Sequence, residues 1–327
     1  MRRPLILPAL LLIAALSPAA PQAKRPLELA RTISLPAAKG ALTEIAYDAE
    51  RRHLIVAAGA DDLLEVVDAQ TGAHLQTVIG MNKPRGIAVI PGLSAFSVTN
   101  AGDGSFKNFD AATFQIKKSI PLGENAECIR YDPVTRRIYA GYGRGSIAII
   151  DPASNSRLGD LELTDHPGSF ILENPGQRIF AIAGTKAQIT VIDKGRNTLL
   201  APLPLKGARS PAALALADKR LFIGCRKPAK MLIYDTETLR RVAEVPLPDD
   251  PGSISYDNVR HLLYVSSGGG SISVIAQKDP DHYRQTAKVP SAPGAVTSIF
   301  VQELDLLFLA VPRHGSQGAR LDVYRAH

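Results

Sequence analysis

Residues 128–163 read CIRYDPVTRRIYAGYGRGSIAIIDPASNSRLGDLEL, and this stretch decides the fold. It contains four short runs of alternating or β-branched residues, CIRYD, RIYAGYG, SIAIID and RLGDLEL, which is the pattern of β-strands. Turn-forming residues separate the runs at Asp132–Pro133, at Gly143–Gly145 and at Asp151–Pro152. The stretch therefore predicts one antiparallel unit of four strands.

The unit is repeated along the chain. Its second run has copies at HLIVAAG, AFSVTNA, RIFAIAG, RLFIGCR, LLYVSSG and LLFLAVP, spaced 41 to 44 residues apart. A second, independent series ends the third run in five units, at Asp68, Asp110, Asp151, Asp193 and Asp235. A hydroxyl residue follows most of these aspartates three positions later, which favours a structural Asx turn over catalysis.

Seven four-stranded units of about 42 residues predict an all-β, seven-bladed β-propeller with antiparallel blades. The last unit lacks an outer strand, and LARTISLP at residues 29–36 resembles the outer strands of other units. This N-terminal strand is expected to pair with the C-terminal blade and close the ring. The predicted domain covers residues 24–327, with blades at 41–80, 81–123, 124–164, 165–206, 207–247, 248–290 and 291–327 plus strand 29–36.

The first 23 residues have the features of a signal peptide. Arg2 and Arg3 precede an apolar run, Leu5 to Leu16, and small residues follow, with candidate cleavage points between Ala19 and Ala23. The run is shorter than the roughly 20 residues that cross a bilayer, so no transmembrane span is expected in the mature chain. The protein is therefore expected to be periplasmic or secreted, and Cys128 and Cys225, two blades apart, to be buried free thiols.

Ligands of propellers usually bind where loops surround the mouth of the central channel. The loops predicted to reach that face carry more basic than acidic residues, within a formal net charge of +7 for the whole chain. This excess of basic residues has two interpretations. The loops form either an ordinary solvated rim or a site that binds a small anion or a protein partner. The candidate ligand-binding residues are Arg85, Glu127, Tyr142, Arg144, His166, Arg226 and Lys227.

The arginines and the tyrosine are candidates because of their chemistry. Guanidinium groups bind oxyanions in bidentate fashion, which favours Arg85, Arg144 and Arg226. Tyr142 offers either a stacking surface beside Arg144 or a side chain packed between blades. Because nucleophile motifs, close histidine pairs and phosphate-binding loops are absent from the sequence, no catalytic residue is assigned, and a binding protein is favoured over an enzyme.

The repeats resemble the YVTN-repeat, YncE-like bacterial propellers over essentially the whole mature chain. FSVTN at residues 96–100 is close to the signature of that family, and LYVSS at 263–267 and RIYAG at 137–141 are looser copies. The resemblance implies an exported, cofactor-free propeller. It also implies possible single-stranded DNA binding, which would need aromatic platforms between cations.

A calcium-dependent lactonase of the gluconolactonase type is the enzymatic alternative. TEIAYD at residues 43–48 resembles the opening of that pattern, and oxygen ligands for Ca²⁺ would come from Glu44, Asn100, Asn125 and Glu127. The repeat register, however, places Glu44 and Glu127 one position out of phase. Simple strand alternation then predicts that the two carboxylates point to opposite sides of their strands.

Overall fold

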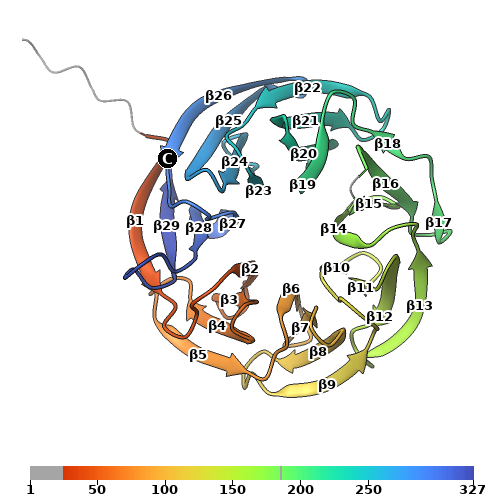
Figure 1. Cartoon of the computed structure of the whole chain (residues 1–327), viewed down its shortest axis with the longest axis vertical. Helices are drawn as coiled ribbons and strands as arrows, with labels where there is room; N and C mark the ends of the chain where they lie inside the picture. Colours follow the sequence, from red (N-terminus) through yellow and green to blue (C-terminus); the bar gives the residue numbers. More distant parts are fainter. Residues whose placement is uncertain (1–24, 185) are drawn as a thin grey trace, which may run out of the picture.

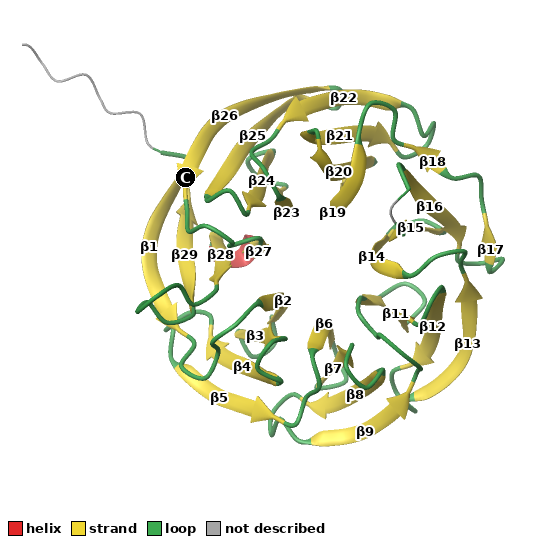
Figure 2. Ribbon diagram, viewed as in Figure 1, coloured by secondary structure: helices red, strands yellow, loops and turns green. Residues whose placement is uncertain are grey.

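The computed structural model describes residues 25–184 and 186–327, and these residues form a ring of seven β-sheets (Figure 1). The expected signal peptide, residues 1–23, lies outside the described residues. Strands make up nearly all of the regular structure, with one 3-10 turn, η1 (Gln302–Leu304), in the described part of the chain (Figure 2). No helix in that part is long and apolar enough to cross a membrane. The predicted seven-bladed propeller is confirmed.

Each blade runs from an innermost strand at the channel to an outermost strand at the rim. The first blade contains β2 (Leu42–Asp48), β3 (His53–Ala58), β4 (Leu63–Asp68) and β5 (His74–Ile79). The second contains β6 (Pro84–Ile90), β7 (Ala95–Asn100), β8 (Ser105–Asp110) and β9 (Ile116–Pro121). The third contains β10 (Ile129–Asp132), β11 (Arg137–Tyr142), β12 (Ser146–Asp151) and β13 (Ser156–Glu162).

The fourth blade has an interrupted outer strand. It contains β14 (Pro167–Leu172), β15 (Arg178–Ala183) and β16 (Gln188–Asp193), and two short segments, β17 (Thr198–Leu199) and β18 (Leu203–Pro204), pair with β16. The fifth blade contains β19 (Arg209–Ala217), β20 (Arg220–Lys227), β21 (Ala229–Asp235) and β22 (Arg241–Pro246). The sixth contains β23 (Pro251–Asp257), β24 (Leu262–Ser267), β25 (Ser271–Asp279) and β26 (His282–Pro290).

The seventh blade combines both ends of the described chain. It contains β27 (Thr297–Val301), β28 (Leu306–Val311), β29 (Arg320–Ala326) and, as its outermost strand, β1 (Leu27–Ser34). β1 pairs antiparallel with β29 from Leu27↔Ala326 to Ser34↔Arg320, so the red and blue strands lie side by side in Figure 1. The predicted ring closure is confirmed, with the strand beginning two residues earlier than expected.

The repeated large residue of each second strand lies in the core. The seven side chains are at most 3% exposed, at Ile55, Phe96, Tyr139, Phe180, Phe222, Tyr264 and Phe308. They pack between neighbouring blades: Ile55 of β3 and Phe96 of β7 belong to one apolar cluster, in which the Phe96 and Phe109 rings stack at 4.8 Å. The repeat spacing thus reflects the packing of one blade against the next.

The aspartate series forms turns, as predicted. Oδ1 of each aspartate accepts backbone N–H groups two or three residues ahead, for example from Gln70 and Thr71 at Asp68, at 2.9 and 2.6 Å. The hydrogen bond from the Thr71 N–H is the main cause of the lowered pKa of Asp68. Cys128 and Cys225 are buried free thiols, as expected.

Candidate functional site

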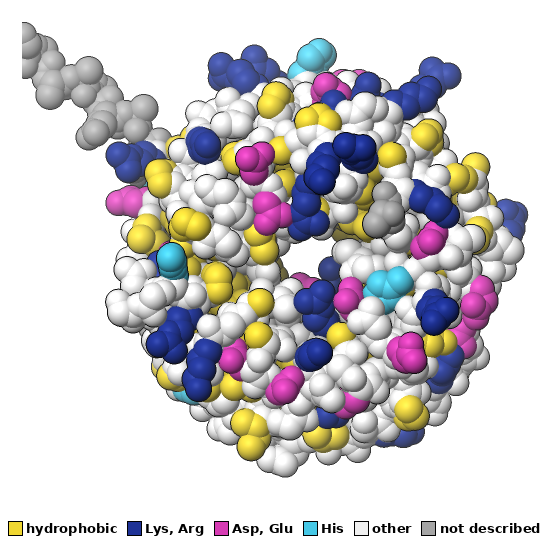
Figure 3. All heavy atoms as spheres, viewed as in Figure 1, with side chains coloured by type: hydrophobic (Ala, Val, Ile, Leu, Met, Phe, Trp, Pro, Cys, Tyr) yellow, Lys and Arg dark blue, Asp and Glu magenta, His cyan; other side chains and the backbone are white. Residues whose placement is uncertain are grey.

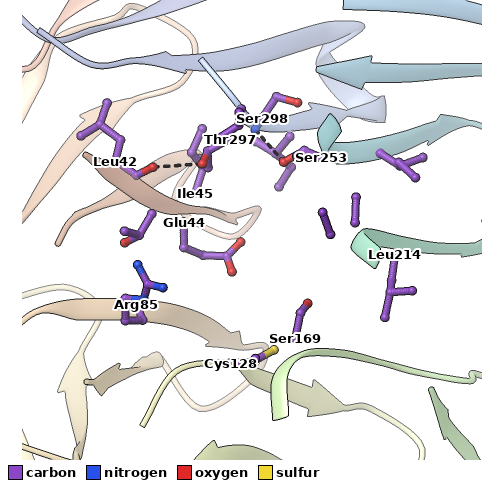
Figure 4. Close-up of a pocket in the computed structure, with 18 of the residues that line it drawn as sticks. Leu42, Glu44, Ile45, Arg85, Cys128, Ser169, Leu214, Ser253, Thr297 and Ser298 are labelled. Carbon is purple, nitrogen blue, oxygen red and sulfur yellow. Dashed lines mark hydrogen bonds between the residues drawn. The ribbon is translucent and has the colours of Figure 1, made fainter. Parts of the chain in front are cut away.

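The innermost strands surround a central cavity of about 570 Å³. Figure 3 shows the opening of the channel at the centre of one face, with basic side chains gathered beside it. Arg85, Glu127, Arg130 and Arg226 line the cavity together with several serine and threonine residues. Figure 4 shows Arg85, Ser253 and Thr297 on its wall. This is the size of cavity that accepts a small organic ligand.

A β-bulge near the start of the innermost strand directs residues toward the channel in five blades. The pairing with the second strand skips one residue in each, and the five skipped residues, Thr43, Arg85, Gly168, Ala212 and Gly252, all line the cavity. A bulge breaks the simple alternation of a strand. The prediction that Glu44 and Glu127 point to opposite sides is therefore wrong, because Glu44 follows the bulged Thr43 and both carboxylates line one cavity.

Four of the predicted residues meet at the channel mouth. Nη2 of Arg85 lies 3.4 Å from Oε1 of Glu127, and Nε2 of His166 lies 3.4 Å from Oε2 of the same carboxylate. Nδ1 of His166 is 2.6 Å from the carbonyl oxygen of Gly143, and the Asn125 amide nitrogen is 3.1 Å from His166 Nε2. The cluster joins the second, third and fourth blades.

Glycine at position 86 allows this cluster to form. A Cβ atom on Gly86 would lie 2.5 Å from the carbonyl oxygen of Glu127, so the second blade can approach the third only without a side chain there. Thr99 donates a short hydrogen bond to the same carbonyl oxygen. The backbone of Glu127 is thus fixed by the neighbouring blade.

The two titratable groups of the mouth influence each other. The hydrogen bond to Glu127 raises the pKa of His166, against the opposing effect of burial. Burial alone would raise the pKa of Glu127, but the contacts with His166 and the charge of Arg85 outweigh it and lower that pKa. The two shifts have opposite signs, as expected for a histidine and a carboxylate that hydrogen-bond to each other.

The other predicted residues lie apart from this cluster. Tyr142 is 9% exposed; its hydroxyl donates to Asp160 at 3.0 Å and its ring faces Arg157 at 5.0 Å. It therefore packs within the fold, the second of the two predicted alternatives, and stacks with Arg157 rather than Arg144. Arg144 is exposed.

Arg226 and Lys227 belong to a basic group on the fifth blade. Both are exposed, and Arg226 Nε donates to Asp250 of the next blade at 2.6 Å. Lys227 is the strand partner of Arg209, and Lys230 pairs with Glu244 at 3.1 Å. Only Arg226 of this group lines the cavity, opposite the Arg85 side of the channel mouth.

The four residues predicted for calcium do not form a common ligand set. Glu44 contacts Arg130 and Glu127 contacts Arg85, both at 3.4 Å. Asn100 is fully buried, and its Oδ1 accepts the N–H of Asn82. Within residues 25–184 and 186–327, no group of three or more His, Cys, Asp or Glu side chains is placed to hold a metal ion.

Sequence reasoning missed Arg130, which reaches the cavity from the third blade. Its Nη1 donates to the carbonyl oxygen of Ile129 at 2.7 Å and to Glu44 Oε2 at 3.4 Å. Burial raises the pKa of Glu44, partly offset by Arg130. The predicted site residues were sought in loops, whereas Arg130 lies on strand β10. Only a prediction that its side chain faces the channel could have identified it.

The fold places the chain among the seven-bladed β-propellers, which commonly serve as binding or interaction scaffolds. No protein-family model and no curated protein matches the sequence. A chain of Kuenenia stuttgartiensis hydrazine synthase is similar in structure, with a TM-score of 0.74 and 17% identity, over 83% of this chain and 93% of that one.

A chain from a mitotic checkpoint complex is also similar, with a TM-score of 0.78 and 14% identity, over 96% of this chain and 98% of that one. At these identities the likeness concerns the fold, which supports many unrelated functions. The function must be argued from the channel and its mouth.

Proposed function

We propose that this chain is an exported, YncE-like propeller that binds a small anionic ligand, or an acidic group of a partner protein, at the mouth of its central channel. The observation that carries the proposal is that Arg85 and Arg226 line one open cavity, with His166 beside Glu127 at its mouth. Arg85 and Arg226 keep 43% and 47% of their side chains exposed, so both remain accessible to a ligand.

The loose contact between Arg85 and Glu127 supports this role. At 3.4 Å and with the arginine exposed, the pair contributes little to stability, so an incoming anion can compete for the guanidinium at small cost. The contact with Glu127 raises the pKa of His166, which favours the protonated form of a second group at the mouth. Export rests on residues 1–23, and N-terminal sequencing of the mature protein would test it, with a first residue expected between 20 and 24.

The two alternatives have less support. The lactonase needs a shared oxygen site, whereas its four residues have separate partners. Single-stranded DNA binding needs stacking platforms beside cations, whereas the Tyr142 ring faces Arg157 within the fold.

The test is charge reversal at the mouth. Arg85→Glu and Arg226→Glu should each weaken the binding of citrate or inorganic phosphate at least tenfold in calorimetric titrations, because each variant replaces an accessible cation by an anion. Arg196→Glu is the matched control, since Arg196 is 80% exposed in the turn between β16 and β17 and should leave binding unchanged. Binding of neither anion to the wild type, or equal binding by all variants, would contradict the proposed site.

A further inference from the structure

The central channel has two chemically different walls. The first and third blades contribute Glu44 and Arg130, whereas the fourth and fifth contribute Ile171, Leu214 and Leu216. Figure 4 shows the carboxylate of Glu44 pointing into the cavity and Leu214 on the opposite wall. A second chamber of about 480 Å³ shares Leu214 and Ile254 with the first, so the apolar wall continues along the channel.

The apolar wall follows from the sequence of β19. Its residues RSPAALALA alternate in burial: Ala213 and Ala215 are buried in the blade, whereas Ala212, Leu214 and Leu216 remain partly exposed toward the channel. Four residue steps at about 3.3 Å each make this wall roughly 13 Å long. Large aliphatic side chains kept partly exposed in a channel are available to an apolar ligand.

Arg130 lies on the polar wall of the same cavity and retains free hydrogen-bonding capacity. Its side chain is 33% exposed, and its Nη1 makes the two contacts described above. Among the described residues, no hydrogen bond is made by its Nε or Nη2. These two donors form one edge of the guanidinium, the edge that binds a carboxylate in bidentate fashion.

We propose that the channel below the mouth binds an amphiphilic monoanion, a carboxylate with an unbranched apolar tail. The carboxylate pairs with Arg130, and the tail lies along Ile171, Leu214 and Leu216. This inference rests on the proposed function, because the anion enters through the basic mouth, but it depends on different residues.

Binding of such an anion is coupled to protonation of Glu44, which faces the same guanidinium. The other titratable groups on the cavity are Arg85, Glu127, Cys128 and Arg226. The pKa of Glu127 is lowered, opposite to the shift of Glu44, and burial raises that of the Cys128 thiol from an ordinary value already far above that of a carboxyl group. Glu44 takes its proton from solvent, and the tail-bearing anion therefore binds more tightly as the pH falls toward the pKa of Glu44.

The experiment is calorimetric titration of the full mature chain with butanoate, hexanoate and octanoate. Affinity should rise roughly two- to fourfold for each added CH₂, because each transfers apolar area out of water. Leu214→Ser and Leu216→Ser should remove most of this dependence on length. Leu75→Ser is the matched control, since Leu75 is an exposed leucine on the outer strand β5.

Two further variants test the polar wall. Arg130→Gln should weaken octanoate binding at least tenfold. Glu44→Gln should strengthen octanoate binding and remove the pH dependence of that binding. This variant deletes a carboxylate instead of leaving one unpaired, so it still tests the polar wall if Arg130→Gln fails to fold.

The outcomes separate this inference from the proposed function. Citrate binding that depends on Arg85, without any effect of chain length among the monocarboxylates, would overturn the channel site and leave the mouth site standing. Equal effects of Leu75→Ser and Leu214→Ser would also overturn it, because they would indicate adsorption to the surface. Absence of binding by every anion would overturn both.

Discussion

Lys194 and Asp132 form an ion pair between the third and fourth blades that is shielded from solvent. Nζ lies 2.8 Å from Oδ2, and the side chains are 2% and 0% exposed. Removing one partner of a buried pair leaves an unpaired charge, so Lys194→Met should lower the free energy of unfolding by about 3–5 kcal/mol. Urea denaturation at neutral pH measures this. The control is Lys219→Met, which removes a pair of the same length that is 71% and 64% exposed, with little effect expected.

The effect of Lys194→Met should depend on pH. Burial alone would raise the pKa of Asp132, but the contacts with Lys194 together with hydrogen bonds from Val134 and Thr135 bring it below the ordinary value of 3.8. In the wild type this stabilisation is present above that value and is lost as the pH falls through the depressed pKa. Without Lys194 two of the lowering causes are lost, so the pKa of Asp132 is higher than in the wild type and Asp132 is protonated at higher pH. The difference between the proteins should therefore narrow toward pH 4; a constant difference would contradict this account.

Among the elements, β1 has one buried and one solvent-facing side. Ile33 is 3% exposed and packs with Leu321 and Val323 of β29, whereas Leu29 is 51% exposed on the same strand. Ile33→Ala should cost about 2–5 kcal/mol of unfolding free energy, because it leaves a cavity in the seventh blade. Leu29→Ala should change it by less than about 0.5 kcal/mol. Equal losses in thermal or urea unfolding would indicate that β1 does not dock as described.

The elements were predictable from the sequence to the extent that they repeat. The large residue of the second strand and the turn aspartate recur because each blade makes the same contacts with its neighbours, so alignment of the units identified both. The outer edge of the fourth blade differs, since Pro202 lies between β17 and β18, and proline lacks the N–H that pairing requires.

The candidate site was less predictable because it depends on departures from the repeat. The bulge at Thr43 brings Glu44 to the channel, and strand alternation alone assigned it to the other side. The contacts of Arg130 with Glu44 and of Arg157 with Tyr142 depend on distances that no local pattern encodes.

The whole molecule is a closed ring whose first and last blades touch at the channel, and whose seventh blade joins both ends of the described chain at the rim. At the channel, Thr297 Oγ1 donates to the carbonyl oxygen of Leu42 at 2.9 Å. At the rim, closure consists of the pairing of β1 with β29 inside the seventh blade. Opening of the ring therefore begins most easily where β1 leaves β29, since this is where the blade joins two ends of the chain without a covalent connection.

A covalent bond at this position should stabilise the entire propeller. Glu28 and Arg325 are exposed cross-strand partners, and such Cα atoms lie roughly 4.5–5.5 Å apart, within the span of a disulfide. In the double variant Glu28→Cys/Arg325→Cys, oxidation should raise the free energy of unfolding by about 2–4 kcal/mol, because the bond constrains nearly the whole unfolded chain. Cys128 and Cys225 are buried and should not exchange with it. Urea unfolding with and without reductant tests this, with Arg325→Cys alone as the control. If oxidised and reduced double variants unfold at the same urea concentration, separation of β1 from β29 does not limit the stability of the ring.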